Sequence, residues 1–195
     1  ERRAALFSEK APRRALRIAA AFGACARRLG PRGLFGAIGV CARQRATIAG
    51  LPDPETALAH ADGLCGLVRD MTPEGLLEGF ARGLSPNELF GALAWWAPRE
   101  RMVMHPDDFQ EPENVRALLA RGGLKITLDR DFDHVAHACG KAQRLSPRLL
   151  HLYAALHDMG FAHSIEIRSA FGRLLGGAYG VALGHAFVTL GAFGE

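Results

Sequence analysis

The sequence predicts a mixed α/β fold, and two observations carry that prediction. Of the 195 residues, 49% are apolar and 23% are charged, which is typical of a globular protein and excludes a wholly disordered chain. From residue 124 onward the hydrophobic pattern indicates a strand, two helices and then three strands. That order is typical of an antiparallel meander that follows a helical pair. No apolar run approaches ~18 residues, so we expect no membrane-spanning helix.

The N-terminal third of the chain is expected to be helical. Apolar residues recur at helical spacing over 12–29, and the Gly-Pro pair that follows is expected to end this helix. A weaker, glycine-diluted helix is expected over 33–49. Two prolines at 51–54 indicate a turn, and a third helix is expected over 55–69.

Charge is distributed unevenly along the chain. Residues 1–50 hold eleven Lys and Arg against two Glu, a net charge of +9, whereas the remainder carries −5. Such a region either contacts an anionic partner, nucleic acid or a lipid surface, or is a solvated basic helix face, which is the simpler interpretation. We place a domain boundary near residue 70. Residues 1–70 then form a helical basic N-terminal extension, and residues 71–195 form a second domain.

The second domain is expected to open with a capped helix, in which Thr72 is the N-cap and Pro73 the first helical residue. A short apolar and aromatic segment follows at 92–97, and a strand-like run at 101–104. A helix is expected over 112–120, ended by two glycines. Residues 124–128 alternate as in a half-buried strand, with Leu and Ile facing the core and Lys and Thr facing outward.

The rest of the second domain carries the helical pair and the meander. Helices are expected over 132–139 and from the Ser-Pro pair at 146–147 to Gly160. Strands are expected over 163–168, 174–183 and 186–190, joined by a hairpin turn at 169–173 and by Gly184.

Cysteine usage points away from disulfides and metal sites. The four cysteines are scattered without a CxxC pair, so reduced core thiols in a cytosolic protein are expected. His134 and His137 lie near Cys139, but the spacing and the lack of a fourth ligand argue against a zinc site. We expect no metal.

The adjacent residues Trp95 and Trp96 are the strongest single indication of a functional or structural contact in the sequence. Two adjacent side chains on a strand point to opposite faces, so both cannot point into the same core. The pair either lines a substrate cleft or clamps the small N-terminal part against the core.

Glu166 lies on the expected strand at 163–168, on the same face as Ser164 and Arg168. It either orders a polar site or pairs with Arg168, and we favour the pair.

Several other residues have both a functional and a structural interpretation. Tyr153 and Tyr179 either present rings and hydroxyls to a site or are core aromatics. Gly176–Gly177 either lets the backbone approach a ligand or marks a bulge, and it lacks the spacing of a dinucleotide fingerprint. His157 and His163 are expected to be packed histidines rather than bases.

Five segments together resemble the leucyl/phenylalanyl-tRNA–protein transferase family. The most specific are 153–166 (YAALHDMGFAHSIE), which resembles Y-x-x-L-H-x-x-G-x-A-H-S-[IV]-E, and 176–182 (GGAYGVA), which resembles G-G-x-Y-G-V-A. Segment 95–101 (WWAPRER) resembles W-W-S-P-x-P-R, and segments 76–83 and 124–139 resemble the family's helix ending in aromatic-x-x-Gly and its strand and first helix. The resemblance covers about residues 71–190.

The resemblance implies a partial GNAT-like acyltransferase core and an aminoacyl-tRNA–protein transferase that acts in the cytoplasm without a cofactor or metal. Such an enzyme moves Leu or Phe from charged tRNA to the N-terminal Arg or Lys of a protein, which marks that protein for degradation. We expect Glu166 and Tyr153 to be catalytic. The residues expected to bind substrate are Trp95, Trp96, Gly176, Gly177, Ala178 and Tyr179.

The sequence also departs from the family pattern. A family glutamate that contacts substrate falls on Leu190, unless a shifted alignment matches Glu195 instead, and a family methionine falls on Ala178. We also expect the chain to be truncated before the family's further strands. These departures leave two alternatives open: a GNAT-like acyltransferase with another acyl donor, and a non-catalytic tRNA-binding remnant.

Overall fold

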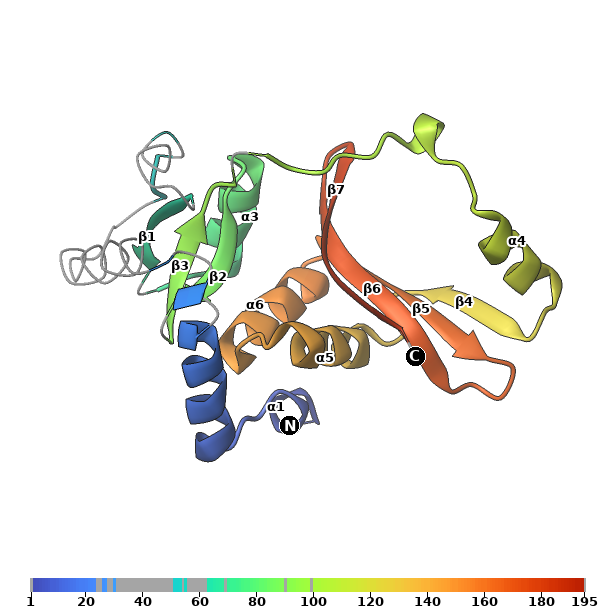
Figure 1. The fold of residues 1–195 in the computed structure, drawn as a ribbon, viewed down its shortest axis with the longest axis horizontal. Helices are drawn as coiled ribbons and strands as arrows, with labels where there is room; N and C mark the ends of the chain where they lie inside the picture. Colours follow the sequence, from blue (N-terminus) through green and yellow to red (C-terminus); the bar gives the residue numbers. More distant parts are fainter. Residues whose placement is uncertain are drawn as a thin grey trace. The chain divides into compact units, whose positions relative to one another are not determined.

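The structure is a computed structural model, and it describes residues 2–23, 26–27, 30, 51–53, 55, 63–68, 70–89, 91–98 and 100–194. The chain divides into two units, each with one antiparallel sheet (Figure 1). Unit one comprises Glu1–Arg99 and Arg144–Ala155, and unit two comprises Glu100–Gln143 and Leu156–Glu195. The mixed α/β composition predicted from the sequence is confirmed.

Unit one carries a three-stranded sheet in the order β1-β3-β2. β1 (Leu64–Val68) and β2 (Ser85–Leu89) both pair antiparallel with β3 (Ala92–Trp96). The helix expected over 55–69 is therefore wrong at residues 64–68. A short apolar run fits a buried strand and a buried helix equally well, and here pairing with β3 decides. Residues 56–62 lie outside the described part.

The helix α3 (Pro73–Ala81) begins as predicted. Thr72 Oγ1 accepts a hydrogen bond from the Gly75 N–H at 3.1 Å, and Pro73 occupies the first turn. The domain boundary expected near residue 70 stays a prediction, although β1 before it pairs with β3 after it.

The N-terminal segment contributes α1 (Arg2–Leu6) and a helix over residues 11–23. The helix predicted over 12–29 is thus confirmed at its described residues, 12–23 and 26–27, while the one expected over 33–49 lies outside the described residues. Arg17 on this helix is nearly buried and pairs with Glu9 at 3.0 Å and with Glu88 of β2. At this position the basic face is therefore neutralised inside unit one.

Unit two carries the predicted meander. Its four strands lie in the order β4-β5-β6-β7, all antiparallel: β4 (Leu124–Leu128), β5 (Ala162–Ser169), β6 (Leu174–Leu183) and β7 (Ala186–Gly194) (Figure 1). The helix α5 (Phe132–Gln143) packs on one face of this sheet. The helix α6 (Pro147–Asp158) begins in unit one and ends in unit two.

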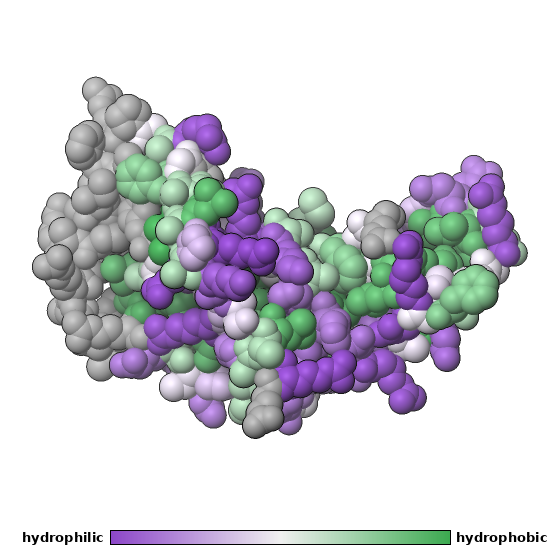
Figure 2. Space-filling model, turned by 90° about the horizontal axis from the view of Figure 1, so that it is seen from below, coloured by the Kyte–Doolittle hydropathy of each residue, from purple (hydrophilic) through white to green (hydrophobic). Residues whose placement is uncertain are grey.

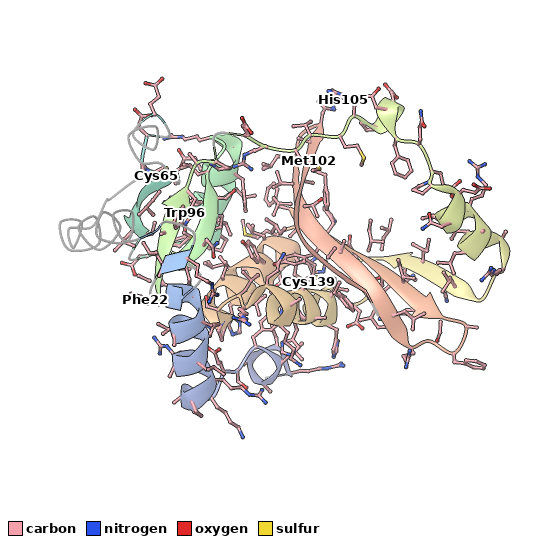
Figure 3. The ribbon with its side chains drawn as sticks, in the orientation of Figure 1. Phe22, Cys65, Trp96, Met102, His105 and Cys139 are labelled. Atoms are coloured by element: carbon pink, nitrogen blue, oxygen red, sulfur yellow. The ribbon has the colours of Figure 1, made fainter. Side chains whose placement is uncertain are left out.

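The segment between the two sheets is largely irregular. Residues 101–104, expected to be strand-like, have no regular structure and are exposed, because none of the described strands pairs with them. Met102, drawn in Figure 3, is fully exposed. A single 3-10 turn (Pro106–Asp108) and α4 (Glu113–Ala120) follow, and α4 ends before two glycines as predicted.

The sheet of unit two has one covered face and one open face. Ser164, Glu166, Tyr179 and Val181 lie buried on the face that α5 covers. The expectation that Leu124, Ile126 and Leu128 face the core is wrong, since Ile126 is 56% and Leu128 66% exposed. The predicted alternation is present, but the opposite face points inward, because Thr127 turns toward the buried Glu166 carboxylate and donates a hydrogen bond to it.

The opposite side of this sheet is hereafter the open face. Its members follow from the strand register: Leu124, Ile126, Leu128, His163, Ile165, Ile167, Gly176, Ala178, Gly180 and Phe187. Green, hydrophobic side chains are visible at the right of Figure 2, the end at which Figure 1 draws α4 and β4. Among the helices that the structure describes, none combines the length and the hydrophobicity of a membrane-spanning segment.

Candidate functional site

A buried carboxylate organises the covered side of unit two. Glu166 of β5 is fully buried. Its Oε2 accepts hydrogen bonds from Thr127 Oγ1 at 2.5 Å and from the Arg130 N–H at 3.4 Å. Its Oε1 accepts from Ser164 Oγ at 2.6 Å and from the Asp131 N–H at 3.3 Å. A buried charge needs such donors, and here they join β4, β5 and the turn before α5.

The expected pair between Glu166 and Arg168 is wrong. Arg168 Nη2 donates to Asp131 Oδ2 at 2.6 Å, and Nη1 donates to the Gly172 carbonyl at 3.1 Å. Asp131 Oδ1 also lies 2.5 Å from His134 Nδ1. Burial raises the pKa of Asp131, but the hydrogen bonds from Arg168 and His134 outweigh it and bring the pKa below its usual value. Arg168 thus finds its carboxylate on Asp131, because four other donors already surround Glu166.

A second carboxylate, Asp129, links the end of β4 to the start of β5. Its Oδ1 accepts from the Ser164 N–H at 2.7 Å, and its own N–H donates to the Ser164 carbonyl at 3.0 Å. Its Oδ2 lies 2.8 Å from His163 Nδ1. Burial raises the pKa of Asp129, but the bonds from His163 and Ser164 bring it below its usual value. Asp129 adopts a left-handed backbone conformation, with φ 53°, which Asp tolerates better than most residues.

His157 borders the same carboxylate. Its Nδ1 lies 2.8 Å from the Ala162 carbonyl oxygen and 3.9 Å from Asp129 Oδ1. Its ring stacks on Phe132, with centroids 4.3 Å apart and planes 5° from parallel. His157 is therefore the packed histidine that we expected.

β6 brings four of the predicted site residues next to Glu166. The register places Gly177 across from Glu166, Ala178 across from Ile165, and Tyr179 across from Ser164. Tyr179 is buried on the covered face, where its ring meets Phe132 edge-on at 5.8 Å. Ala178 lies on the open face.

Gly176 and Gly177 differ in what surrounds them. A Cβ on Gly177 would lie 2.7 Å from the Ile165 carbonyl oxygen and 3.1 Å from Val135 of α5. This glycine therefore allows helix and sheet to pack closely. Gly176 lies on the open face, and the register shift beside it marks an irregularity at Leu175.

The remaining predicted site residues belong to unit one. Trp95 is buried, and a Cβ on Gly79 of α3 would lie 2.3 Å from its ring. Trp96 points to the other face of the sheet and packs half-buried on the cluster of Leu64, Leu89 and Ala94. Its indole N–H is buried without a hydrogen-bond partner among the described residues. Figure 3 labels Trp96 on β3 and Cys65 on the neighbouring β1.

Tyr153 is the third predicted residue of unit one. It lies on α6 and is buried, and burial raises the pKa of its hydroxyl. Trp95, Trp96 and Tyr153 are thus in unit one, whereas Glu166, Gly176, Gly177, Ala178 and Tyr179 lie together in unit two. In the part of the chain that the structure describes, no three His, Cys, Asp or Glu side chains are placed to hold a metal ion.

Sequence reasoning missed Asp129 and Thr127, two residues that complete this polar arrangement. Asp129 lies 34 residues before His163, and Thr127 lies 39 residues before Glu166. No local sequence pattern predicts contacts between residues so far apart in the chain. Only the β4–β5 register brings these side chains together.

Comparison with known proteins confirms the family resemblance. Residues 103–195 match the family model described as "Leucyl/phenylalanyl-tRNA protein transferase". A leucyl/phenylalanyl-tRNA–protein transferase of Syntrophus aciditrophicus is 37% identical over 150 residues, which cover 73% of this chain and 60% of the relative. One of Nitrosospira multiformis is 36% identical over 151 residues, covering 74% of this chain and 62% of the relative. The chain thus spans about three fifths of the length of these relatives.

Proposed function

Because the chain belongs by sequence to the leucyl/phenylalanyl-tRNA–protein transferase family, we propose that it is an aminoacyltransferase. It moves Leu or Phe from charged tRNA to the N-terminal Arg or Lys of a protein. The observation that carries the proposal is the family match over residues 103–195, which includes all four strands of unit two. The transferred Leu or Phe directs the modified protein to degradation. The cytoplasm is the compartment that this role requires.

The chemistry of this transfer asks little of the enzyme beyond placement and one proton transfer. An amine attacks an ester that tRNA charging has already activated, so no cofactor is called for. The proposed core is GNAT-like. Its support is the antiparallel sheet of β4 to β7, interrupted in sequence by α5 and α6.

The open face of unit two is our proposed place for the transferred side chain. It presents exposed Ile126, Leu128 and Ile165 beside the small residues Gly176 and Ala178. Leu and Phe are apolar, and burying them against such a face is favourable. Gly177 and Tyr179 support it from the covered side.

Glu166 and Tyr153, expected to be catalytic, are both buried and act in this proposal by positioning other groups. Glu166 does so through its four hydrogen bonds, which hold the strand that carries Ile165. Trp96, which is half-buried, remains a proposed substrate contact, since aromatic rings stack on bases. Trp95 is buried against α3, so in this proposal it acts only by holding the sheet of unit one.

The proposal is tested by transfer of labelled leucine from leucyl-tRNA to a peptide that begins with Arg. The Syntrophus aciditrophicus relative serves as positive control, and an N-acetylated peptide of the same sequence removes the attacking amine. We expect transfer to the free peptide alone. If the relative transfers and this chain does not, the proposal is wrong, and acetyl-CoA as donor and salt-dependent tRNA binding then test the two alternatives.

A further inference from the structure

Asp129 and His163 form a dyad at the margin of the open face. The imidazole Nδ1 lies 2.8 Å from Asp129 Oδ2, and the His163 side chain is 40% exposed. His163 lies across from Gly180 and two residues before Ile165, whose partner is Ala178. The dyad therefore borders the surface on which we place the transferred side chain.

The hydrogen bonds determine which ring nitrogen carries the proton. Asp129 is an acceptor toward His163, so Nδ1 of the neutral ring must be protonated and donate. The other nitrogen, Nε2, then bears a lone pair. Among the described residues, no group forms a hydrogen bond with Nε2. An exposed imidazole with a bare Nε2 and a carboxylate behind Nδ1 is the arrangement of a general base.

A second histidine lies beside the dyad. His157, at the end of α6, has its Nδ1 3.9 Å from Asp129 Oδ1. His157 directs its own Nδ1 to a carbonyl oxygen and is held by Phe132, so it is not the residue turned toward the open face.

We propose that His163, held by Asp129, is the proton acceptor of the aminoacyl transfer; this rests on the proposed function. The neutral N-terminal amine of the acceptor attacks the ester carbonyl carbon, and a carbon–nitrogen bond forms. Nε2 of His163 takes one amine proton. The carbon–oxygen bond to the ribose then breaks, its electron pair goes to the ribose oxygen, and that oxygen takes the proton from Nε2. The products are an amide and a free tRNA hydroxyl, and His163 is regenerated.

Asp129→Asn is the sharpest variant for this proposal. Asn tolerates the left-handed backbone conformation of residue 129, so the turn is kept. The Ser164 N–H can only donate, so it holds the amide oxygen of Asn in place of Asp129 Oδ1. The amide NH2 then faces His163 Nδ1, which must accept, and the ring proton moves to Nε2. The variant thus reverses the tautomer and removes the base without removing the histidine.

The tautomer is measured without any activity, by two-bond 1H–15N NMR of imidazole-labelled protein at pH 8. His163→Gln assigns the signal. We expect wild-type His163 to carry its proton on Nδ1 and the Asp129→Asn variant to carry it on Nε2. A wild-type ring protonated on Nε2 overturns the proposal.

Transfer kinetics provide the second measurement. We expect His163→Gln and Asp129→Asn each to lower kcat by on the order of 10²-fold with KM nearly unchanged, because the proton acceptor acts after binding. His134→Gln is the matched control, since the His134 side chain has the same 40% exposure and its Nδ1 likewise faces a carboxylate, that of Asp131. Its kcat is expected to stay within twofold.

The outcomes separate the two proposals. Wild-type transfer with kcat undiminished in His163→Gln overturns the role of His163 alone. Equal losses of kcat in His163→Gln and His134→Gln also overturn it, since they indicate a general structural effect. No transfer by the wild type, beside an active relative, overturns the proposed function and this role with it.

Discussion

Replacing Glu166 by Gln tests the buried carboxylate of unit two directly. The substitution keeps the size of the side chain and changes one acceptor oxygen into a donor. Each oxygen of Glu166 accepts from one hydroxyl and one backbone N–H. Whichever oxygen becomes NH2, the hydroxyl beside it can rotate and accept, but the backbone N–H cannot.

The expected cost follows from that count. One backbone donor, of Arg130 or Asp131, loses its acceptor, which costs about 1–3 kcal/mol at a buried site. The two bonds to the remaining oxygen lose their charge assistance, and relief from burying a charge offsets part of that loss. We expect Glu166→Gln to lower the free energy of unfolding by about 2 kcal/mol. With a urea m-value of roughly 2 kcal/mol/M, the midpoint falls by about 1 M.

Urea unfolding followed by far-UV circular dichroism measures this effect. The matched control is Glu78→Gln, which makes the same chemical change on an exposed carboxylate of α3 paired with Arg82, where surface pairs contribute little. A Glu166→Gln midpoint equal to that of the control would refute the reasoning, because the carboxylate would then not hold the sheet.

Three further predictions concern single sites. Gly79→Ala should destabilise unit one by about 1–2 kcal/mol, since its Cβ would lie 2.3 Å from Trp95, whereas Gly75→Ala in the same helix meets only ordinary contacts. Tryptophan fluorescence in urea measures this loss of stability, and equal unfolding midpoints for Gly79→Ala and Gly75→Ala would contradict the prediction. Asp131 has a folded pKa below its usual ~3.9, so its contribution to stability is complete above that value and is lost as pH falls through the folded pKa. The free energy of unfolding should therefore fall less for Asp131→Asn than for the wild type between about pH 5 and pH 3. Equal falls in the two proteins over that range would contradict the prediction. Burial raises the pKa of Cys139 to about 11, so iodoacetamide at pH 8 should leave it unlabelled until urea unfolds the protein, as peptide mass mapping checks.

Elements bounded by local chemistry could be predicted from the sequence. The strand over 174–183 matches β6 residue for residue, and Thr72 caps α3 as expected. The ends of these elements depend on glycines and capping residues only a few positions away in the sequence. The strand at 64–68 could not be separated from a helix, because its apolar run has no period of its own and its pairing partner, β3, is distant in the sequence.

The candidate site was only partly accessible to the same reasoning. The motif around residues 153–166 led to the right strand, yet the role of Glu166 depends on Thr127 and on two backbone N–H groups before α5. For the same reason, the face of β4 that points inward is the opposite of the one predicted. A rule that apolar residues face inward fails where a buried charge needs polar neighbours and the described residues leave the opposite face exposed.

The path of the chain through the two units has a consequence for how unit two forms. β5, β6 and β7 follow one another through short turns, whereas Leu128 meets Ile165 only after the intervening chain has closed a loop. That loop leaves unit two after Gln143 and supplies Arg144–Ala155 to unit one before it returns. Loop closure is entropically costly and non-local pairing is slow, so we expect β4 to pair last, after β5, β6 and β7 have formed their antiparallel sheet. No continuous fragment can therefore contain all of unit two without carrying a piece of unit one, and the folding of each unit is tied to that of the other through one helix.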